Sequence, residues 1–523
     1  MTLPILKTEH KKNRHILRRI AFVLTAALCL LCLCACDLGG LLEPVEPTEK
    51  PTAPSGTEPG FTLSYRTDDS LDPHFCTGRT NSELAALMYD KLLVIGSDYT
   101  PSGGLCSGWE TDGQTVTLTL RDDIFFSDGS RFTSADCDYS FKRAKSSPGI
   151  YSSRFSRIIS WNAVSDFVFS VTFSTENEYN VNLLDIPVIK NGTGSAPIGT
   201  GRFIRAEKDG EQVLVQNYLN PASADGDFPI NMIKLQGADS AEDQIYDINY
   251  GVIHLLYSDL SNGSSSMRGN IELVRYTDNS LIFAVLNTDR EYFADPNAAL
   301  GILYCINRQT IVHDTLSNTA EAVWYPFCPA WNQTRQADLN RDIYSSVLAH
   351  ESFTAAGLTL KGLKRTWKGS DLELTLLVNS ESRDKMKVAE NIADDLRNMG
   401  FSATVKALKQ KDFDTAVANG DYDIYFSKEA IPANMDFSGL MSGDPKGQIR
   451  YTEELKVALS EFLSGKTDMR SFLGVFRQQL PFIPICYTRS ALAVNRLVSG
   501  NFTPGPSELY TGIEKWTFNE DDR

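Results

Sequence analysis

The sequence predicts an α/β protein built from two or three lobes, and three observations support this prediction. The chain has 523 residues, which is more than a single hydrophobic core usually serves. Hydrophobic residues make up 42% of it and charged residues 22%, a balance typical of a folded globular protein. Residues 372–408 read as strand, helix and strand, and Gly400 suits the position after the helix. Such a unit pairs its strands in parallel through a right-handed crossover, as α/β folds do.

The first residues read as a targeting segment. Residues 11–19 are basic, and residues 20–33 form an apolar run that is shorter than the roughly 20 residues a membrane-spanning helix needs. This predicts a signal peptide over residues 1–36. Leu33-Cys34-Ala35-Cys36 looks like a bacterial lipobox, which predicts a lipid-bearing Cys36; an ordinary Cys-rich signal peptide is the alternative. Residues 37–60, rich in Pro, Glu and Thr, are expected to form a tether.

The chain is acidic, and this charge bears on its partners. Its formal net charge is −16, and the basic targeting segment makes the rest of the chain more acidic still. Such a chain repels nucleic acid and anionic lipid, so we expect neither to bind the folded body. The cysteines beyond the targeting segment are scattered and include no Cys-x-x-Cys pair. This predicts neither a zinc site nor a disulfide scaffold, although one or two bridges remain open.

Hydrophobic periodicity places further elements along the chain. Alternation with a period of two marks strands, and apolar positions three or four residues apart mark helices. Thr133 reads as a helix N-cap because Asp136 follows three positions later, and residues 127–130 read as a turn around Gly129. The expected strands are 61–65, 115–120, 168–173, 281–287, 372–378, 402–408, 423–426 and 481–487, and the expected helices are 81–93, a short helix after Thr133, 240–250, 300–312 and 383–400.

Several motifs at consistent spacing resemble those of a known family. Residues 120–144 read L-R-x-x-x-x-F-S-D-G-x-x-x-T-x-x-D-x-x-Y-S-x-x-R-A, and residues 197–203 read P-I-G-T-G-R-F. Residues 71–74 (L-D-P-H) precede them, and residues 481–487 follow late in the chain. The chain therefore resembles the family 5 extracellular solute-binding proteins of ABC importers, the oligopeptide-, dipeptide- and nickel-binding group. The resemblance covers about residues 61–517.

The resemblance implies a two-lobed periplasmic-binding-protein-like fold, with an extra inserted lobe and mixed sheets joined by hinge strands. It also implies a monomeric, extracellular lipoprotein on the outer face of the bacterial cytoplasmic membrane. This protein would capture a peptide or peptide-like solute between hinged lobes and deliver it to ABC permease subunits. The alternatives are a receptor-like or structural lipoprotein without transport, and a binder of a nickel chelate or an oligosaccharide. The expected lobes are 61–100 with 191–284 and 486–523 (lobe I), 101–190 (inserted lobe II) and 285–485 (lobe III).

No motif points to an enzyme. The metalloprotease pattern HExxH and the nucleophile-elbow pattern GxSxG are both absent, and the histidines beyond the targeting segment stand alone. We therefore expect no catalytic residue, no metal site and no cofactor. A hydrolase lipoprotein is the competing class, and a nucleophile–base pair in a pocket would reveal it.

The resemblance also implies where ligand contacts lie. In peptide-binding relatives, the acid that pairs with the peptide's amino terminus follows a Gly-Trp pair, soon after a strand matched here by residues 423–426. Lys428 and Glu429 occupy the Gly-Trp place, so Glu429 or Asp436 would substitute for that acid and residues 427–436 would form a pocket-lining loop. For the aromatic candidates outside this loop, simple packing is an equal alternative. The predicted ligand-binding residues are Ser427, Lys428, Glu429, Asp436, Tyr487, Tyr151 and His74.

Overall fold

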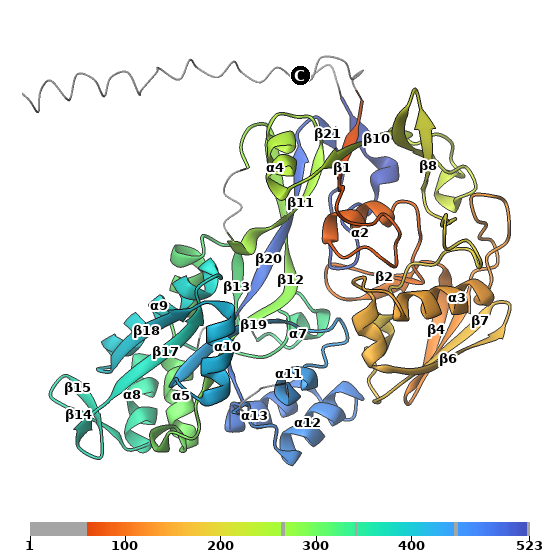
Figure 1. Ribbon diagram of the computed structural model, residues 1–523. Coiled ribbons are helices and arrows are strands. Elements are labelled where there is room, and N and C mark those ends of the chain that lie inside the picture. Colours follow the sequence, from red (N-terminus) through yellow and green to blue (C-terminus); the bar gives the residue numbers. More distant parts are fainter. Residues whose placement is uncertain (1–59, 263–266, 340–342, 444–447, 520–523) are drawn as a thin grey trace, which may run out of the picture. The chain divides into compact units, whose positions relative to one another are not determined.

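The chain divides into two units, Met1–Glu58 and Pro59–Arg523. A computed structural model describes residues 60–519 of the protein, apart from 263–266, 340–342 and 444–447 (Figure 1). The predicted signal peptide, the tether and the lipid-bearing Cys36 lie outside the described residues. Within those residues, no helix is long and apolar enough to cross a bilayer.

A mixed sheet of eleven strands runs through the described part of the chain (Figure 1). Its two longest strands, β12 and β20, lie antiparallel near its middle, and they include most of the predicted strands 281–287 and 481–487. The strand order is β18 (Ser402–Leu408), β17 (Glu373–Asn379), β19 (Ile424–Ala430), β12 (Ile271–Leu286), β20 (Ile483–Asn495), β11 (Leu255–Asp259), β1 (Thr62–Arg66), β10 (Met232–Ala238), β9 (Glu211–Gln216) and β8 (Phe203–Lys208), with β13 (Ala320–Ala322) also paired to β20.

The pairing of β12 with β20 is interrupted where the sheet changes partners. Its register shifts between Thr277 and Leu281, which is the signature of a bulge. Asp278 lies in this bulge, and its carboxylate accepts hydrogen bonds from Thr488 Oγ1 at 2.8 Å and Ser490 Oγ at 3.0 Å. Beyond the bulge, residues 280–286 of β12 also pair with β19. The bulge is therefore tied to β20 by side chains where the main-chain ladder is broken.

A second, four-stranded antiparallel sheet carries the family motif. Its order is β4 (Cys106–Asp112), β5 (Thr115–Leu120), β7 (Val168–Phe173) and β6 (Ile158–Ser165), and helix α3 (Ser134–Lys145) packs against β6 and β7. The N–H of Thr133 donates to the Asp136 carboxylate at 2.9 Å, which confirms the predicted cap. Gly129 has a φ of +84° in the predicted turn. Local sequence therefore specified this segment correctly.

The predicted strand–helix–strand unit is confirmed. Helix α9 (Arg383–Asn398) connects β17 to β18, which pair in parallel. Its apolar stripe, represented by Val388, Ile392 and Leu396, is fully buried. Gly400 takes a φ of +93° just beyond the helix, a conformation that glycine adopts at little cost.

The predicted helix over residues 81–93 is wrong in its second half. Helix α2 (Arg79–Ala85) ends early, because the main chain beyond it bonds to distant segments. The carbonyl of Leu87 accepts from Phe203 N at 2.9 Å, and that of Met88 accepts from Gly201 N at 3.0 Å. A strand entry more than a hundred residues away therefore takes the bonds that a continued helix would use.

The predicted helix over 300–312 also has different bounds. Helix α5 (Pro296–Cys305) begins at the Asp295 cap, whose carboxylate accepts from Asn297 N at 2.8 Å. It stops at Ile306, which is extended. The short α6 (Arg308–Thr310) and a π-helical turn (Ile311–Thr315) follow. The Asp-Pro start signal was present in the sequence and outweighed the apolar periodicity.

Three of the four buried clusters within the described residues draw on the segments of the predicted lobes, and the fourth is a small one formed by Ile248, Ile253, Leu256 and Ala493. One draws its buried side chains from residues 92–188, and a second from 61–89, 189–255 and 492–516. The third draws mainly on residues 281–487, and it also takes in Ile95 and Tyr99, which were assigned to lobe I. The division into three lobes remains a prediction.

The remaining helices and strands are β2 (Leu93–Ile95), β3 (Pro101–Gly103), α4 (Ala241–Asn249), α7 (Asn332–Gln336), α8 (Ser346–Ala355), β14 (Leu358–Lys361), β15 (Lys364–Trp367), β16 (Ser370–Asp371), α10 (Gln410–Asn419), α11 (Ser438–Ser442), α12 (Glu453–Leu463), α13 (Met469–Gln479), β21 (Val498–Ser499) and β22 (Thr517–Phe518).

Candidate ligand-binding site

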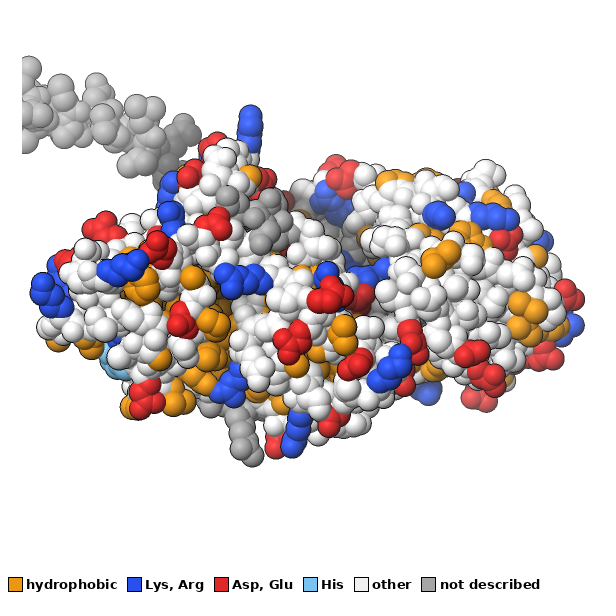
Figure 2. Space-filling view, turned by 90° about the horizontal axis from the view of Figure 1, so that it is seen from below, with side chains coloured by type: hydrophobic (Ala, Val, Ile, Leu, Met, Phe, Trp, Pro, Cys, Tyr) orange, Lys and Arg blue, Asp and Glu red, His pale blue; other side chains and the backbone are white. Residues whose placement is uncertain are grey.

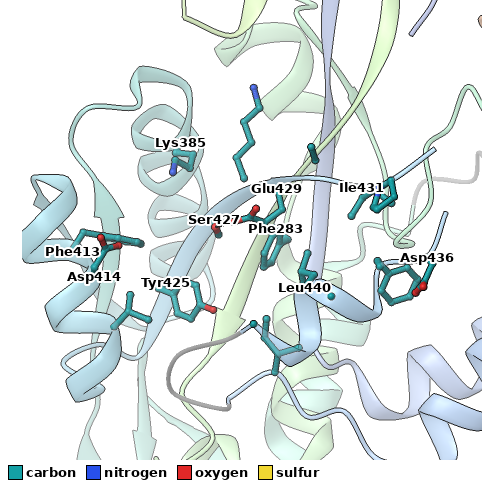
Figure 3. Close-up of a pocket in the computed structure, with 18 of the residues that line it drawn as sticks. Phe283, Lys385, Phe413, Asp414, Tyr425, Ser427, Glu429, Ile431, Asp436 and Leu440 are labelled. Atoms are coloured by element: carbon teal, nitrogen blue, oxygen red, sulfur yellow. Dashed lines mark hydrogen bonds between the residues drawn. The ribbon is translucent and has the colours of Figure 1, made fainter. Parts of the chain in front are cut away.

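A cavity of about 520 Å³ lies beside the carboxyl end of β19 (Figure 3). Residues of helices α9, α10 and α11, of strand β12 and of the segment 431–437 also line it, together with Arg157, Gly443 and Ile449. Much of the cavity wall is apolar, as in most sites for small molecules. In Figure 3, Ser427 and Glu429 lie between a Phe413–Asp414 end and an Asp436 end. The apolar side chains include Phe283, Phe413, Tyr425, Ile431, Phe437 and Leu440.

The predicted pocket-lining loop is partly a strand. Strand β19 continues to Ala430, because its residues 427–430 pair with residues 280–283 of β12. The expectation that residues 427–430 form a loop is therefore wrong, and the loop begins only after Ala430. Since side chains alternate across a strand, Ser427 and Glu429 lie on one face of the sheet and Lys428 on the other. All three border the cavity, as does Asp436.

One edge of this strand end is open. On the side away from β12, β19 pairs with β17 only through Ile424 and Tyr425. Within the described residues, no strand pairs with residues 427–430 on that side. Main-chain N–H and C=O groups at such an edge can pair with an added extended segment.

Glu429 is an exposed acid of the cavity, as is Asp414 on α10. The Glu429 carboxylate accepts a hydrogen bond from Ser427 Oγ at 3.3 Å, and it forms no ion pair with another of the described residues. Burial lowers the pKa of Lys385 on α9, and the negative charge of Glu429 partly opposes this shift. A neighbouring ammonium group therefore senses the Glu429 charge without being bonded to it.

The negative charge of Asp436 is already balanced by an arginine. Its buried carboxylate forms an ion pair with Arg157, which precedes β6 of the four-stranded sheet. Arg157 Nη2 also donates to the Asp436 carbonyl at 2.9 Å, and Ser438 N donates to the Asp436 carboxylate at 3.0 Å. With its charge balanced by a guanidinium, Asp436 is a poorer receptor for a ligand amine than Glu429.

The charge of Lys428 affects two carboxyl groups near the cavity, those of Asp278 and Asp384. Burial raises the pKa of Asp278, and Lys428 opposes this rise. Burial also raises the pKa of Asp384 on α9 to about 6; Lys428 again opposes it, whereas Asp259 adds to it. Asp259 borders a second cavity, of about 650 Å³, between α4 and the end of β11.

The other three predicted ligand residues lie away from the first cavity and are buried. Tyr487 Oη donates to Pro326 O at 2.7 Å, and His74 Nε2 lies 2.9 Å from Pro187 O. The ring of Tyr151 packs against the cationic groups of Lys91 and Arg154, at 5.7 and 5.2 Å. These contacts give each residue a packing role, and a ligand role for any of them remains a prediction.

Sequence reasoning missed several residues of the cavity wall. Arg157 lies 279 residues from Asp436 in the chain, and no local pattern marks it as a partner. Phe413 and Asp414 lie on α10, a helix that was not predicted. Lys385 stands in the first turn of the predicted helix α9, but its position facing Glu429 depends on how that helix packs.

The cavity is equipped for binding by shape, hydrogen bonds and charge. Among the described residues, no group of three or more His, Cys, Asp or Glu side chains could hold a metal ion. The six cysteines in that part of the chain are free and buried, where they pack as small hydrophobic side chains. On the face shown in Figure 2, acidic and basic side chains are interspersed.

Comparisons with known proteins agree with one another. The family model "Bacterial extracellular solute-binding proteins, family 5 Middle" matches residues 100–443. The chain is similar to the nickel-binding periplasmic protein of Escherichia coli (strain K12), with 22% identity over 83% of this chain and 90% of that protein. It is also similar to the oligopeptide-binding protein AppA of Bacillus subtilis (strain 168), with 21% identity over 77% and 81%.

A comparison with solved structures supports the fold. The periplasmic murein tripeptide binding protein MppA, in its unliganded open form, has a TM-score of 0.71 and 17% sequence identity. The match covers 90% of this chain and 100% of that one. The predicted two-lobed, periplasmic-binding-protein-like α/β fold is thus confirmed.

Proposed function

The chain belongs to the family 5 bacterial extracellular solute-binding proteins, which serve ABC importers, and we propose that its solute is a peptide or peptide-like molecule. The observation that carries this proposal is the open edge of β19 at residues 427–430, beside a cavity with an exposed carboxylate. An extended peptide can pair with a strand edge whatever its sequence. Two of the similar proteins are named for oligopeptide and murein tripeptide binding.

We assign the capture of the peptide's amino group to Glu429. A carboxylate without a cationic partner attracts an ammonium group, and the low dielectric of a partly enclosed cavity strengthens that attraction. Asp436 is less suited, because Arg157 already balances its charge. The aromatic and aliphatic wall would accept apolar side chains of the solute by shape alone.

Transport then depends on motion and requires no bond chemistry in this chain. Strands β12 and β20 run through both halves of the large sheet, so bending at their bulge would change the angle between the halves. A solute that contacts both halves binds the closed form better and shifts the balance toward it. The closed, loaded form would be the one delivered to the permease subunits. We propose that the protein is a monomeric binder and not an enzyme.

Native mass spectrometry of protein purified without denaturation tests the choice of solute. We expect bound peptides, either copurified or taken up from a tryptic digest of casein. Retention of a nickel chelate or an oligosaccharide in place of peptides would identify a non-peptide binder. Failure to bind any of these probes would favour a receptor-like or structural lipoprotein without transport.

We further propose that Cys36 carries a lipid that anchors the protein to the outer face of the cytoplasmic membrane. The support is the run Leu33-Cys34-Ala35-Cys36 after a basic and apolar segment. Metabolic labelling with an alkyne analogue of palmitate tests this. We expect Cys36→Ser to lose the label and the neighbouring Cys34→Ser to keep it. Labelling of both variants would contradict the assignment.

A further inference from the structure

The segment over residues 175–183, which we call the strap, joins the four-stranded sheet to the cavity loop over residues 431–437. Its apolar side chains Val181 and Leu183 are buried in the core of the four-stranded sheet. Asn177, Asn180 and Asn182 of the strap form hydrogen bonds to the loop. Asn177 Nδ2 donates to Asn434 O at 3.0 Å, Asn182 Nδ2 donates to Ala433 O at 3.1 Å, and Asn434 Nδ2 donates to Asn180 Oδ1 at 2.9 Å.

The loop that receives these bonds is strained and borders the cavity. Met435 is fully buried and has a φ of +60°, a left-handed conformation that a residue other than glycine rarely adopts. Ile431, Pro432, Asp436 and Phe437 all line the cavity. A short loop in such a conformation persists only when its surroundings hold it.

The other end of the loop is held from the hinge region. Ile431 N donates to Asn279 O at 2.8 Å, and Asn279 Nδ2 donates to the carbonyls of Ile431 and Pro432. Asn279 lies in the bulge of β12. Hydrogen bonds therefore attach the loop to β12 at one end and to the strap at the other.

We propose that Asn177, Asn180 and Asn182 are positioning residues of the ligand site, although none of them lines the cavity. They hold residues 433–436 in the conformation that shapes its wall. Arg157 adds the ion pair to Asp436 from the same sheet. These hydrogen bonds and the ion pair tie the cavity loop to the four-stranded sheet.

Because these amides are buried, water cannot replace a hydrogen bond that is lost between the strap and the loop. Asn177, Asn180, Asn182 and Asn434 are all at most 2% exposed. Removing one amide leaves its partner without a hydrogen bond and out of reach of water, which is unfavourable. Substitution should therefore loosen the loop first, since its backbone is the strained element.

Hydrogen exchange on the unliganded, full-length protein tests the strap without any ligand. We expect Asn182→Ala to increase amide exchange at residues 433–436 by roughly 2- to 10-fold, the effect of losing one net hydrogen bond. The matched control is Asn162→Ala, which removes an exposed asparagine on β6 of the same sheet and should leave the loop unchanged. Unchanged exchange at 433–436 in a folded Asn182→Ala protein would overturn the proposal.

A double-mutant cycle keeps the test decisive if Asn182→Ala fails to fold. Asn180 and Asn434 bond side chain to side chain, so Asn180→Ala and Asn434→Ala should not have additive effects on loop exchange. Additive effects would mean that the two segments are not coupled, and would also overturn the proposal.

Affinity provides the last readout, and only this readout rests on the proposed function. For peptides of the casein digest that bind the wild type, we expect Asn182→Ala to weaken binding several-fold, while Asn162→Ala does not. If the digest does not bind the wild type, the peptide proposal fails, and the exchange data alone decide on the strap. Wild-type affinity in a variant with a loosened loop would refute the positioning role.

Discussion

At the scale of single residues, Glu429 and Asp436 border the same cavity but differ in charge balance. Asp436 is paired with Arg157, whereas the Glu429 carboxylate accepts a hydrogen bond only from Ser427 in the described structure. Both were open as the acid that captures an amine, and the sequence offered no means of choosing. The choice depends on a guanidinium that belongs to another sheet.

Replacing Glu429 by Gln should therefore weaken peptide binding. A hydrogen bond to a charged group contributes about 1.5–3 kcal/mol, so we expect affinity for peptides of the casein digest to fall by about 10-fold or more. Isothermal titration calorimetry measures this fall. The control is Glu110→Gln on β4, because Glu110 is also an exposed acid but does not line the cavity. Equal affinity of wild type and Glu429→Gln would remove Glu429 from the ligand's amino group.

A second residue-scale prediction concerns stability in acid. Burial lowers the pKa of His74 to about 4 from 6.5, so the folded protein keeps this ring neutral while the unfolded chain protonates it. The stability that His74 contributes is present above pH 6.5 and is lost as the pH falls toward 4, by as much as about 3 kcal/mol. His74→Gln can still donate to Pro187 O but cannot titrate.

Urea unfolding of wild type and His74→Gln between pH 4 and 7 checks this prediction. We expect the free energies of unfolding to converge as the pH falls, because only the wild type takes up the extra proton on unfolding. Other titrating groups, such as Asp384, whose raised pKa acts in the opposite direction, are present in both proteins and cancel in the difference. A difference that does not vary with pH would contradict the assignment.

At the scale of elements, the entry into β8 shows how one segment determines where another ends. Gly201 N bonds to the Met88 carbonyl just beyond α2, and the backbones approach so closely that a Cβ on Gly201 would lie within 3.0 Å of Leu87 O and Met88 C. The glycine in this motif is thus needed for close approach between two chain segments. The sequence marks residues 197–203 as a family motif, but it does not show the segment against which they pack.

Gly201→Ala should accordingly destabilise the protein by about 2 kcal/mol or more, since backbone atoms cannot move aside as a flexible side chain can. The midpoint of urea unfolding measures the effect. Gly108→Ala on β4 is the matched control, because a Cβ at Gly108 meets no atom within 4 Å. If both substitutions have the same small effect, the close approach is not a constraint on the fold.

Elements whose bounds depend on local signals were predicted correctly, and elements that depend on distant segments were not. Strands β5, β7 and β18 have the predicted bounds, because alternation and the turns beside them are local signals. Helix α2 and strand β19 differ from prediction, because distant segments compete for their main-chain groups. In α2 the competitor is the β8 entry, and in β19 it is residues 280–283 of β12.

At the scale of the whole molecule, a solute that closes the hinge should change both size and stability. The radius of gyration from small-angle scattering is expected to fall when peptides of the casein digest bind. Binding should also stabilise the folded state, by about 2.7 kcal/mol when free ligand is 100 times Kd. Thermal unfolding under the same conditions measures this stabilisation. Glu429→Gln serves as the control and should need more ligand for both changes. Stabilisation without a change in size would mean that the protein binds the solute without closing.

The sequence by itself determined the family and part of the local structure. Short stretches of sequence specify the capped helix at Thr133 and the glycine-rich entry into β8 at residues 197–203. Turns, caps and close approaches demand particular residues at fixed spacing. Only the tertiary structure decided which of Glu429 and Asp436 is paired with an arginine, and which asparagines form hydrogen bonds to the cavity loop. Arg157 and Asp436 are 279 residues apart, and Asn180 and Asn434 are 254 apart. Pairing over such distances depends on how separately folded segments pack, and no local pattern encodes it.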